Sequence, residues 1–169
     1  MLEMLARGPL WGDGLQYAHG TGHGIGAYLN VHEGPIGIGG GTVTGDTIVS
    51  QPRMLKYYMA PIDLGMYVSD EPGFYKPGDW GIRIESDLVS VPATTPTAEP
   101  MPPVGSRQWL AFEYVTKVPF CRKLIAVDLL SKQETAWIDA YHADVLAALT
   151  PLLSEPARAW LEVETAPLQ

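Results

Sequence analysis

The 169-residue sequence lacks several features that mark particular classes of protein. Its one cysteine, Cys121, excludes an internal disulfide framework and a zinc site built on cysteines. Its one asparagine, Asn30, is not part of an N-glycosylation sequon. It has no apolar run of the roughly 20 residues that a membrane span needs, and it starts without the basic and apolar stretches of a signal peptide. A reducing compartment, the cytoplasm, is therefore the expected location.

Positive charge is also scarce. The chain has 11 lysines and arginines against 19 aspartates and glutamates, a formal net charge of −8 at pH 7. This balance argues against nucleic acid or an anionic membrane surface as a partner.

The hydrophobic fraction of 46% is enough for a packed core and exceeds that of disordered chains. We therefore expect a folded chain of roughly one domain's length.

The distribution of glycine, proline and apolar residues predicts strands in the first two thirds of the chain. Glycines crowd residues 8–45 and prolines crowd residues 92–103. Apolar alternation between turn signals predicts strands within 15–33, 65–71, 81–91 and 108–118, a helix end at 2–7, and loops at 34–53 and 92–107. The segment 81–91 is predicted to be one strand, or two strands with a bulge.

The last third has a helical pattern. Ser131 and Glu134 form a capping-box signature that opens a long helix. One stripe of this helix is apolar at helical spacing, through Trp137, Ile138, Tyr141, Val145, Ala148 and Leu149. A second, shorter helix starts at Ser154 and contains Trp160. We expect Trp137, Tyr141 and Trp160 to be core contacts, and strands followed by helices to give an α+β fold.

Three of the four histidines, His19, His23 and His32, fall within 14 residues. His19 and His23 are separated by glycines and a threonine, so a regular helix is excluded. On a strand, positions i and i+4 share a face, and the pair could line one pocket. The alternative is that these are turn histidines that bond to nearby backbone groups.

Two glutamates are candidates for the same chemistry. Glu71 ends an apolar run, and Glu85 lies in an alternating segment. Apolar flanks predict partial burial, and a buried carboxylate is costly unless it is paired or binds a metal. The alternative for Glu85 is a salt bridge with Arg83, on the same strand face. One histidine and two glutamates without thiolates suit Mn²⁺, Co²⁺ or Zn²⁺, and two ions with a bridging hydroxide are a common hydrolytic device.

Three motifs occur in order: HGTGHGIGAYLNVHEGP at 19–35, MYVSDEPGFY at 66–75 and GIRIE at 81–85. With LAFEYVTKVPF at 110–120, they closely resemble the X-Pro aminopeptidase family (aminopeptidase P), in its cytosolic form. The resemblance implies the pita-bread fold, in which two pseudo-symmetric halves surround a dinuclear metal site. This chain would be its C-terminal half, with a curved, mostly antiparallel sheet, helices and a C-terminal helical tail.

The resemblance also implies roles for single residues. His23, Glu71 and Glu85 match metal ligands, with Glu85 bridging two ions, and Glu71 also matches the general base. Arg83 and Tyr75 match a pair that orients the ligands. We expect His23, Glu71 and Glu85 to reach one point, with their donor atoms within about 6 Å of each other, since direct ligation needs about 2.0–2.2 Å.

Two more histidines have matches in the family. His32 resembles the catalytic histidine that contacts the scissile amide, and His19 resembles a histidine that lines the pocket for proline. The substrates implied are peptides with proline at the second position. The complete family site holds two metal ions, manganese by preference, with zinc or cobalt as alternatives.

The sequence departs from the family pattern in two places. Asp13 is the sole aspartate before His23 and lies in a turn, so the two aspartate ligands of the family are expected to be absent. Zero or one ion is then expected, and the chain alone is expected to be inactive. The segment 36–62 reads as a loop insertion of roughly a dozen residues, or as a translated intron, since long loops cost little.

The expected organisation is a partial catalytic domain at 1–120 and a helical extension at 121–169. A sheet cut at this boundary would expose an edge and apolar faces that invite another chain. We therefore expect a homodimer, or pairing with the missing half-domain, with Trp11 as an interface candidate.

Two other functions stay open. The chain could be a non-catalytic short form that acts as an interaction or dimerisation module. It could also be a prolidase-like enzyme of the same fold, which the VSDEPGFY and LAFEYVTKVPF stretches and the helical tail disfavour.

Overall fold

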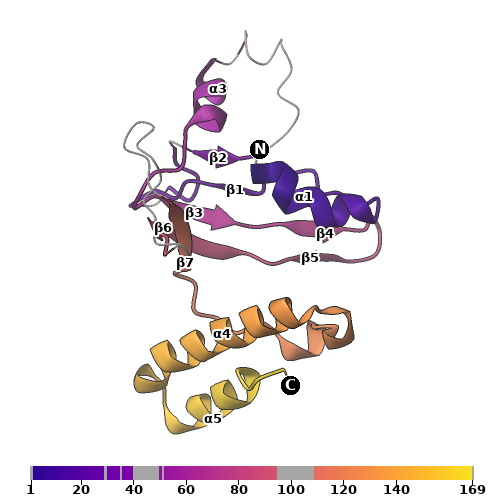
Figure 1. Cartoon of the computed structure of the whole chain (residues 1–169), viewed down its shortest axis with the longest axis vertical. Helices are drawn as coiled ribbons and strands as arrows, with labels where there is room; N and C mark the ends of the chain where they lie inside the picture. The colour runs from indigo at the N-terminus through magenta and orange to yellow at the C-terminus, as the bar shows by residue number, and fades with distance from the viewer. Residues whose placement is uncertain are drawn as a thin grey trace. The chain divides into compact units, whose positions relative to one another are not determined.

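The computed structural model describes residues 2–28, 30–34, 36–39, 50, 52–94 and 109–168 (Figure 1). The chain forms two compact units, Met1–Val115 and Thr116–Gln169. The boundary between the units lies five residues before the predicted one at 120, and the division into a partial catalytic domain and an extension stays a prediction.

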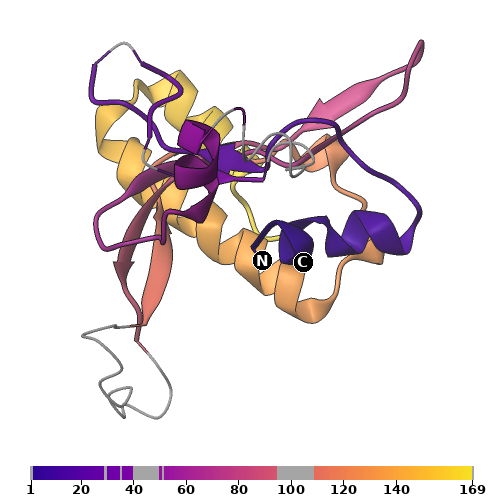
Figure 2. The same cartoon turned by 90° about the horizontal axis from the view of Figure 1, so that it is seen from above.

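Three small antiparallel sheets and two helices form the described part of the first unit. Its elements are α1 (Leu2–Gly12), β1 (Gly22–His23), β2 (Gly37–Ile38), α3 (Pro52–Met59), β3 (Tyr67–Asp70), β4 (Gly73–Tyr75), β5 (Gly81–Arg83), β6 (Ser86–Pro92) and β7 (Leu110–Tyr114). Strands β1 and β2 pair, β3, β6 and β7 form the second sheet in that order, and β4 pairs with β5. The hairpin of β4 and β5 projects from the rest of this unit (Figure 2).

These elements confirm most of the predicted strands. Segment 81–91 is two strands, β5 and β6, in different sheets. The stretch 34–53 was predicted to be a loop throughout, which is wrong, because β2 lies within it and α3 begins at its end. Residues 40–49 and 51 of the predicted insertion, and residues 95–107 of the predicted proline-rich loop, lie outside the described residues.

Helix α1 ends later than predicted. The sequence indicated an end at residue 7, before the first glycine and proline, whereas the helix continues to Gly12 with Pro9 inside it. The actual stop is at Gly14, which has a φ of 70°. The backbone of Leu15 donates to the Leu10 carbonyl there, at 2.8 Å, and closes the helix end.

The segment that holds β1 lies antiparallel to β3. The Glu71 amide donates to the Thr21 carbonyl at 2.7 Å, and the Ile25 amide donates to the Tyr67 carbonyl at 3.2 Å. Gly24 also forms a bridge with Val68. Beneath these strands is a core of Ile36, Val68 and Leu88, against which Ala60, Ile62, Met66 and Tyr114 pack. The core thus fixes β3, the strand that leads into Glu71.

The second unit is helical. It contains the 3₁₀ helices Arg122–Leu124, Val127–Leu129 and Thr150–Leu152, with α4 (Lys132–Leu149) and α5 (Glu155–Glu164). The buried residues of α4 are Ile138, Tyr141, His142 and Val145. The prediction that Trp137 and Trp160 are core contacts is wrong, because they are 47% and 56% exposed. Periodicity places both on the apolar side of a helix, but only the partner elements decide how far that side is covered.

Two neighbouring side chains of α4 hold the chain that leads into this unit. The Tyr141 hydroxyl contacts the carbonyls of Thr116 and Val118, at 3.1 and 2.8 Å. The Phe120 amide donates to Nε2 of His142 at 3.0 Å. Arg122 donates to the Ala166 carbonyl beyond α5. Residues 116–122 are therefore bound to both helices.

A pocket of about 220 Å³, partly open to solvent, is formed by residues of the second unit. It is lined by Lys117, Val118, Pro119, Leu149, Leu153, Ala157, Trp160 and Leu161. In the part of the chain that the structure describes, every helix is too short or too polar to span a bilayer.

Replacing Ser131 by alanine is expected to lower the free energy of unfolding by about 1 kcal/mol, because it removes a formed capping box. The Ser131 hydroxyl accepts from the Glu134 amide, and the Glu134 carboxylate accepts from the Ser131 amide at 2.8 Å. Urea unfolding followed by far-UV circular dichroism measures the change.

Ser154 provides the matched control, because it is the N-cap of α5 and its side chain makes no cap hydrogen bond among the described residues. S154A is expected to change the same free energy by at most about 0.5 kcal/mol. Equal losses for S131A and S154A would contradict the assigned role of the capping box.

Candidate functional site

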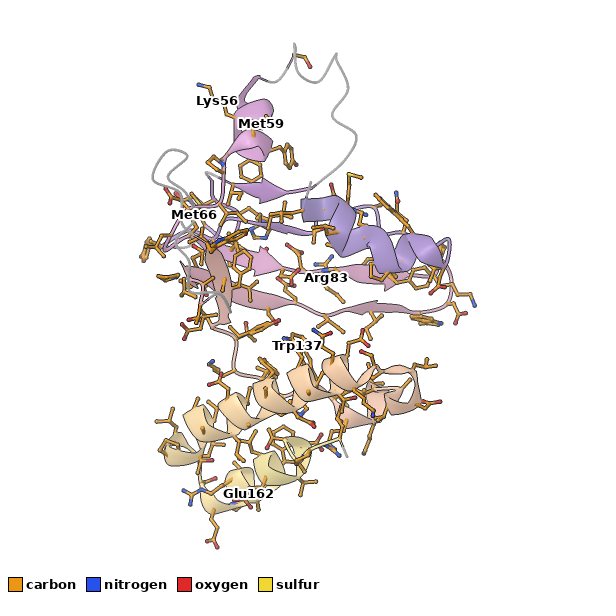
Figure 3. All side chains as sticks on the ribbon, viewed as in Figure 1. Lys56, Met59, Met66, Arg83, Trp137 and Glu162 are labelled. Carbon is orange, nitrogen blue, oxygen red and sulfur yellow. The ribbon has the colours of Figure 1, made fainter. Side chains whose placement is uncertain are left out.

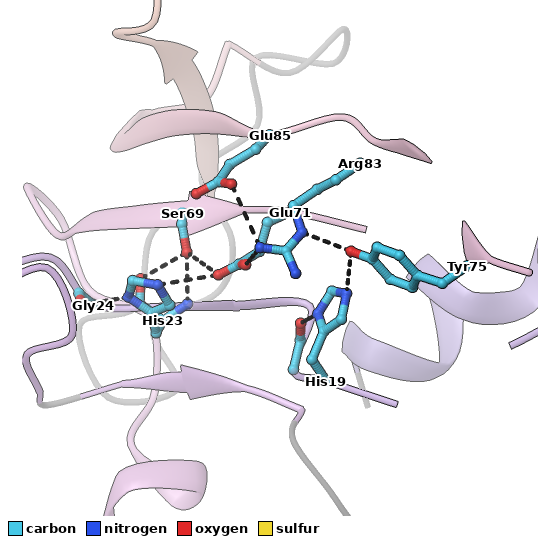
Figure 4. A network of polar contacts seen from close by, with 9 residues as sticks. His19, His23, Gly24, Ser69, Glu71, Tyr75, Arg83 and Glu85 are labelled. Carbon is cyan, nitrogen blue, oxygen red and sulfur yellow. Dashed lines mark hydrogen bonds and ion pairs between the residues drawn. The ribbon is translucent and has the colours of Figure 1, made fainter. Parts of the chain in front are cut away.

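The centre of the candidate site is a contact between His23, at the end of β1, and Glu71, just after β3. His23 Nε2 and Glu71 Oε1 are 3.1 Å apart, and the two side chains are 12% and 11% exposed (Figure 4). His23 Nδ1 lies 2.9 Å from the Gly24 carbonyl, which can only accept, so Nδ1 carries a proton. A neutral ring then directs the lone pair of Nε2 at a carboxylate oxygen. Such a contact is stable only with a proton or a cation between the two atoms.

The spacing of this pair suits a metal ion. Two donors that are each about 2.0–2.2 Å from one ion are about 3 Å apart when they subtend roughly a right angle. Metal-binding histidines commonly donate their other ring N–H to a backbone carbonyl, as His23 does to Gly24. The pair therefore fits two ligand positions of one divalent cation.

Glu85 has a different partner. Arg83 Nη1 lies 3.3 Å from Glu71 Oε2 and 3.9 Å from Glu85 Oε2, and the Glu85 side chain is 46% exposed. Among the residues that the structure describes, no three histidine, cysteine, aspartate or glutamate side chains gather closely enough to hold a metal. The expectation that His23, Glu71 and Glu85 reach one point stays a prediction: His23 and Glu71 are in contact, and Arg83 Nη1 lies between the Glu71 and Glu85 carboxylates. Whether Glu85 is a ligand stays a prediction.

A chain of hydrogen bonds runs from Arg83 to His19. Arg83 Nε donates to the Tyr75 hydroxyl at 2.7 Å, and that hydroxyl lies 2.8 Å from His19 Nε2. His19 Nδ1 donates to the Gly20 carbonyl at 2.7 Å. In the neutral ring, Nε2 therefore accepts the hydrogen bond that the Tyr75 hydroxyl donates. The predicted pair Arg83–Tyr75 thus contacts both Glu71 and His19 (Figure 4).

The third histidine lies against the first pair. The rings of His32 and His23 have centroids 4.2 Å apart at an angle of 46°. His19 and His23 also bond to the carbonyls of the residues that follow them, as the alternative interpretation of turn histidines expected. The structure therefore brings His19, His23 and His32 into one network with Glu71 and also gives two of them a local backbone partner.

The surrounding charges affect the titratable groups at the site. Burial, and then the neighbouring Glu71 carboxylate, raise the pKa of Asp70 above its ordinary range. The hydrogen bond to Tyr75 raises the pKa of Arg83, so the guanidinium stays charged beside Glu71 and Glu85.

Two residues at the site were missed by the sequence analysis. Arg7 of α1 is buried and donates to the carbonyls of Tyr17 and His19, at 2.6 and 2.5 Å, while its guanidinium lies 3.8 Å from the centre of the Tyr17 ring. Ser69 lies between His23 and Glu71. The available signals were a lone arginine in an apolar helix, and a serine two positions before Glu71, on the same strand face.

Trp11, the interface candidate, is partly exposed on α1, and its indole N–H donates to Gln16 Oε1 at 2.8 Å. Its role in an interface stays a prediction.

Comparison with known families gives two matches. The model described as "Metallopeptidase family M24" matches residues 2–91. The model described as "C-terminal region of peptidase_M24" matches residues 108–168. Together they span both units of the structure.

Similar proteins carry related names. The chain is 43% identical to a probable Xaa-Pro aminopeptidase P of Paracoccidioides brasiliensis over 99% of its length, and it covers 24% of that relative. It is also 43% identical to the corresponding protein of Penicillium rubens, of which it covers 25%. The chain thus spans about a quarter of the length of the curated relatives it matches.

A solved structure has the same fold. X-prolyl aminopeptidase from Caenorhabditis elegans, described as a cytosolic enzyme with a di-nuclear active site, superposes with a TM-score of 0.77 and 34% sequence identity. The match covers 98% of this chain and 24% of that one.

Proposed function

This chain belongs to metallopeptidase family M24, and from that premise we propose that it is the C-terminal part of the catalytic domain of an Xaa-Pro aminopeptidase. Its α+β architecture is that of the X-prolyl aminopeptidase fold, the C-terminal half of a pita-bread. The observation that carries the proposal is the 3.1 Å contact of His23 with Glu71, beside His32 and the Arg83–Tyr75–His19 chain. The reaction would remove the N-terminal residue of a peptide whose second residue is proline.

The proposed metal ligands follow from the types of donor atom at the site. His23 and Glu71 would hold one ion, and Glu85 would join them after its carboxylate leaves Arg83. When bound in the complete site, two ions would lower the pKa of water enough to make hydroxide available at neutral pH. Manganese is proposed as the metal, with zinc or cobalt as alternatives, because imidazole and carboxylate suit all three.

The chain's own residues would then bind the peptide and move protons. Glu71 would act as general base, with Arg83 holding its second oxygen in place. His32, next to His23, would donate to the scissile amide. His19, fixed by Tyr75 and Arg7, would line the pocket for the proline ring.

We propose that the 169 residues alone hold at most one ion and do not turn over substrate, because the described residues bring only two donors together. Cytoplasmic location and a homodimer, or pairing with a complementary half-domain, are part of the same proposal. A second candidate is a non-catalytic interaction module. It is favoured by the exposed apolar side chains of α1, which are Leu2, Met4, Leu5 and Trp11.

Metal content and peptide cleavage test the proposal together. The purified chain is expected to bind at most one Mn²⁺ weakly, and to leave an Xaa-Pro peptide intact with Mn²⁺ added. H23A is expected to lose the bound ion, whereas E162Q is expected to retain it, since Glu162 is an exposed residue of α5 in the second unit and no part of the candidate site (Figure 3).

Two ions per chain with turnover would contradict the proposed incomplete site. If the wild-type chain binds an ion, equally tight binding by H23A would contradict the role of His23 as a ligand.

A further inference from the structure

Ser69 is a buried residue of β3 to which the proposed chemistry gives no role. It lies two positions before Glu71, and its side chain contacts both members of the central pair (Figure 4). The His23 amide donates to Ser69 Oγ at 3.0 Å, and Ser69 Oγ lies 3.0 Å from Glu71 Oε1. One hydroxyl therefore joins the backbone of one candidate ligand to the carboxylate of the other.

The chemistry of these groups fixes the direction of each hydrogen bond. An amide N–H can only donate, so the hydroxyl accepts from His23. Its one proton has two acceptors in reach, and Glu71 Oε1 at 3.0 Å is nearer than the His23 carbonyl oxygen at 3.5 Å, so the hydroxyl donates its hydrogen bond to Glu71. Oε1, which accepts this hydrogen bond, is also the oxygen that faces His23 Nε2 at 3.1 Å. Oε2 lies 3.3 Å from Arg83 Nη1. Both oxygens of Glu71 are thereby oriented, one by a neutral donor and one by a cation.

We propose that Ser69 is a positioning residue that sets the orientation of the Glu71 carboxylate toward His23. The inference rests on the proposed function in one respect, that this pair receives a divalent cation. A carboxylate oxygen has more than one lone-pair site, so Oε1 keeps the bond from Ser69 while it binds an ion. Partners of this kind typically change metal affinity by 10–100-fold when they are removed.

The hydroxyl is not what holds the two strands together. The Glu71–Thr21 and Ile25–Tyr67 backbone bonds join the same segments on either side of it. Loss of the hydroxyl should therefore leave the fold in place and release the carboxylate.

Ser90 of β6 provides a matched control for the cost of removing a buried hydroxyl. It is as buried as Ser69, it accepts from the Met66 amide at 2.9 Å, and it donates to the Asp63 carbonyl. S90A therefore removes the same kind of group away from His23 and Glu71. S69T keeps a hydroxyl at the site and tests for rescue.

The experiment compares the full chain with S69A, S69T and S90A by two readouts. Long-range ¹H–¹⁵N spectra report on the His23 imidazole without added metal. Titration with Co²⁺, followed by calorimetry and by visible absorption, reports on the cation. We expect S69A to shift the His23 Nε2 signal and to weaken Co²⁺ binding about tenfold. S69T and S90A should leave both close to wild type.

An unchanged His23 signal in S69A, or an equal change in S90A, overturns the positioning role whether or not cobalt binds. If wild type binds Co²⁺ and the H23A variant binds it equally well, the proposed metal site is overturned instead. In that case, a shifted imidazole signal in S69A alone still supports the role of Ser69 in orienting Glu71. The two failures are therefore distinguishable.

Discussion

Replacing Gly22 by alanine is expected to lower the free energy of unfolding strongly and to separate β1 from β3 at the candidate site. A Cβ at this position would lie 2.0 Å from the Ser69 carbonyl oxygen and 3.0 Å from the Ser69 carbonyl carbon. Both atoms belong to the backbone, so no side-chain rotation relieves the clash. Strand β1 would have to move away from β3, and His23 would move with it.

The expected cost of G22A is about 3 kcal/mol or more in the free energy of unfolding, at the upper end for overpacking, because the backbone itself must shift. The 3.1 Å contact between His23 and Glu71 should be lost as well. Urea unfolding measures the first effect, and the imidazole ¹H–¹⁵N signals of His23 measure the second.

Gly12 is the control for this substitution. It is the last residue of α1, and a Cβ there would meet no atom within 4 Å. Because glycine is a poor helix former, G12A is expected to raise stability by up to about 1 kcal/mol. A G22A variant with wild-type stability and an intact His23 signal would show that β1 and β3 are not packed as closely as described.

Local signals in the sequence were sufficient for several elements. The Ser131–Glu134 capping box needs only residues within one turn, and it appears as predicted at the start of α4. The resemblance to the X-Pro aminopeptidase family matched both His23 and Glu71 to metal ligands, and their side chains lie 3.1 Å apart. The capping box is predictable because its hydrogen bonds are local. The His23–Glu71 contact is predictable because both residues lie in motifs that resemble those of the family.

Other features depend on contacts that no local pattern contains. Ser69 bonds to the His23 backbone across 46 residues, so its role depends on the register of two strands. Helix α1 does not end before Gly8 and Pro9, because both residues lie inside it. It ends where Gly14 adopts the left-handed conformation. The Glu85 carboxylate lies 3.9 Å from Arg83 Nη1, which also contacts Glu71, and no local pattern predicts that Arg83 is shared between the two carboxylates. Sequence thus supplies the candidate groups, and the fold selects among their partners.

Acidification below pH 6.5 is expected to destabilise the second unit through His142. The ring is fully buried, its Nε2 accepts from the Phe120 amide at 3.0 Å, and its Nδ1 has no hydrogen-bond partner among the described residues. Protonation of Nε2 would remove that acceptor and place a charge in the interior. Burial, and then the positive charge of Arg122, lower the pKa of His142, and Asp139 and Glu164 offset this only in part.

The direction of the pH dependence follows from this lowered pKa. Below the ordinary value of 6.5, the unfolded chain takes up the proton more readily than the folded chain. The stabilisation from neutral His142 is therefore complete above pH 6.5. It is lost as the pH falls toward the lowered pKa of the folded state, by at most about 1.4 kcal/mol per pH unit. Hydrogen exchange of peptides from 131–165, compared with peptides from 67–92, measures the loss in each unit of the full chain.

Two substitutions separate His142 from the other groups that titrate in the same range. In H142Q, the side-chain oxygen can accept from Phe120 as Nε2 does, and it does not titrate. We expect H142Q to remove most of the acid sensitivity of exchange in 131–165. H142A leaves the Phe120 amide unpaired and creates a cavity, so it should cost about 2–4 kcal/mol at pH 7.5, also with little pH dependence. If H142Q kept the full acid response, the carboxylates of the helical unit, and not this histidine, would control its stability.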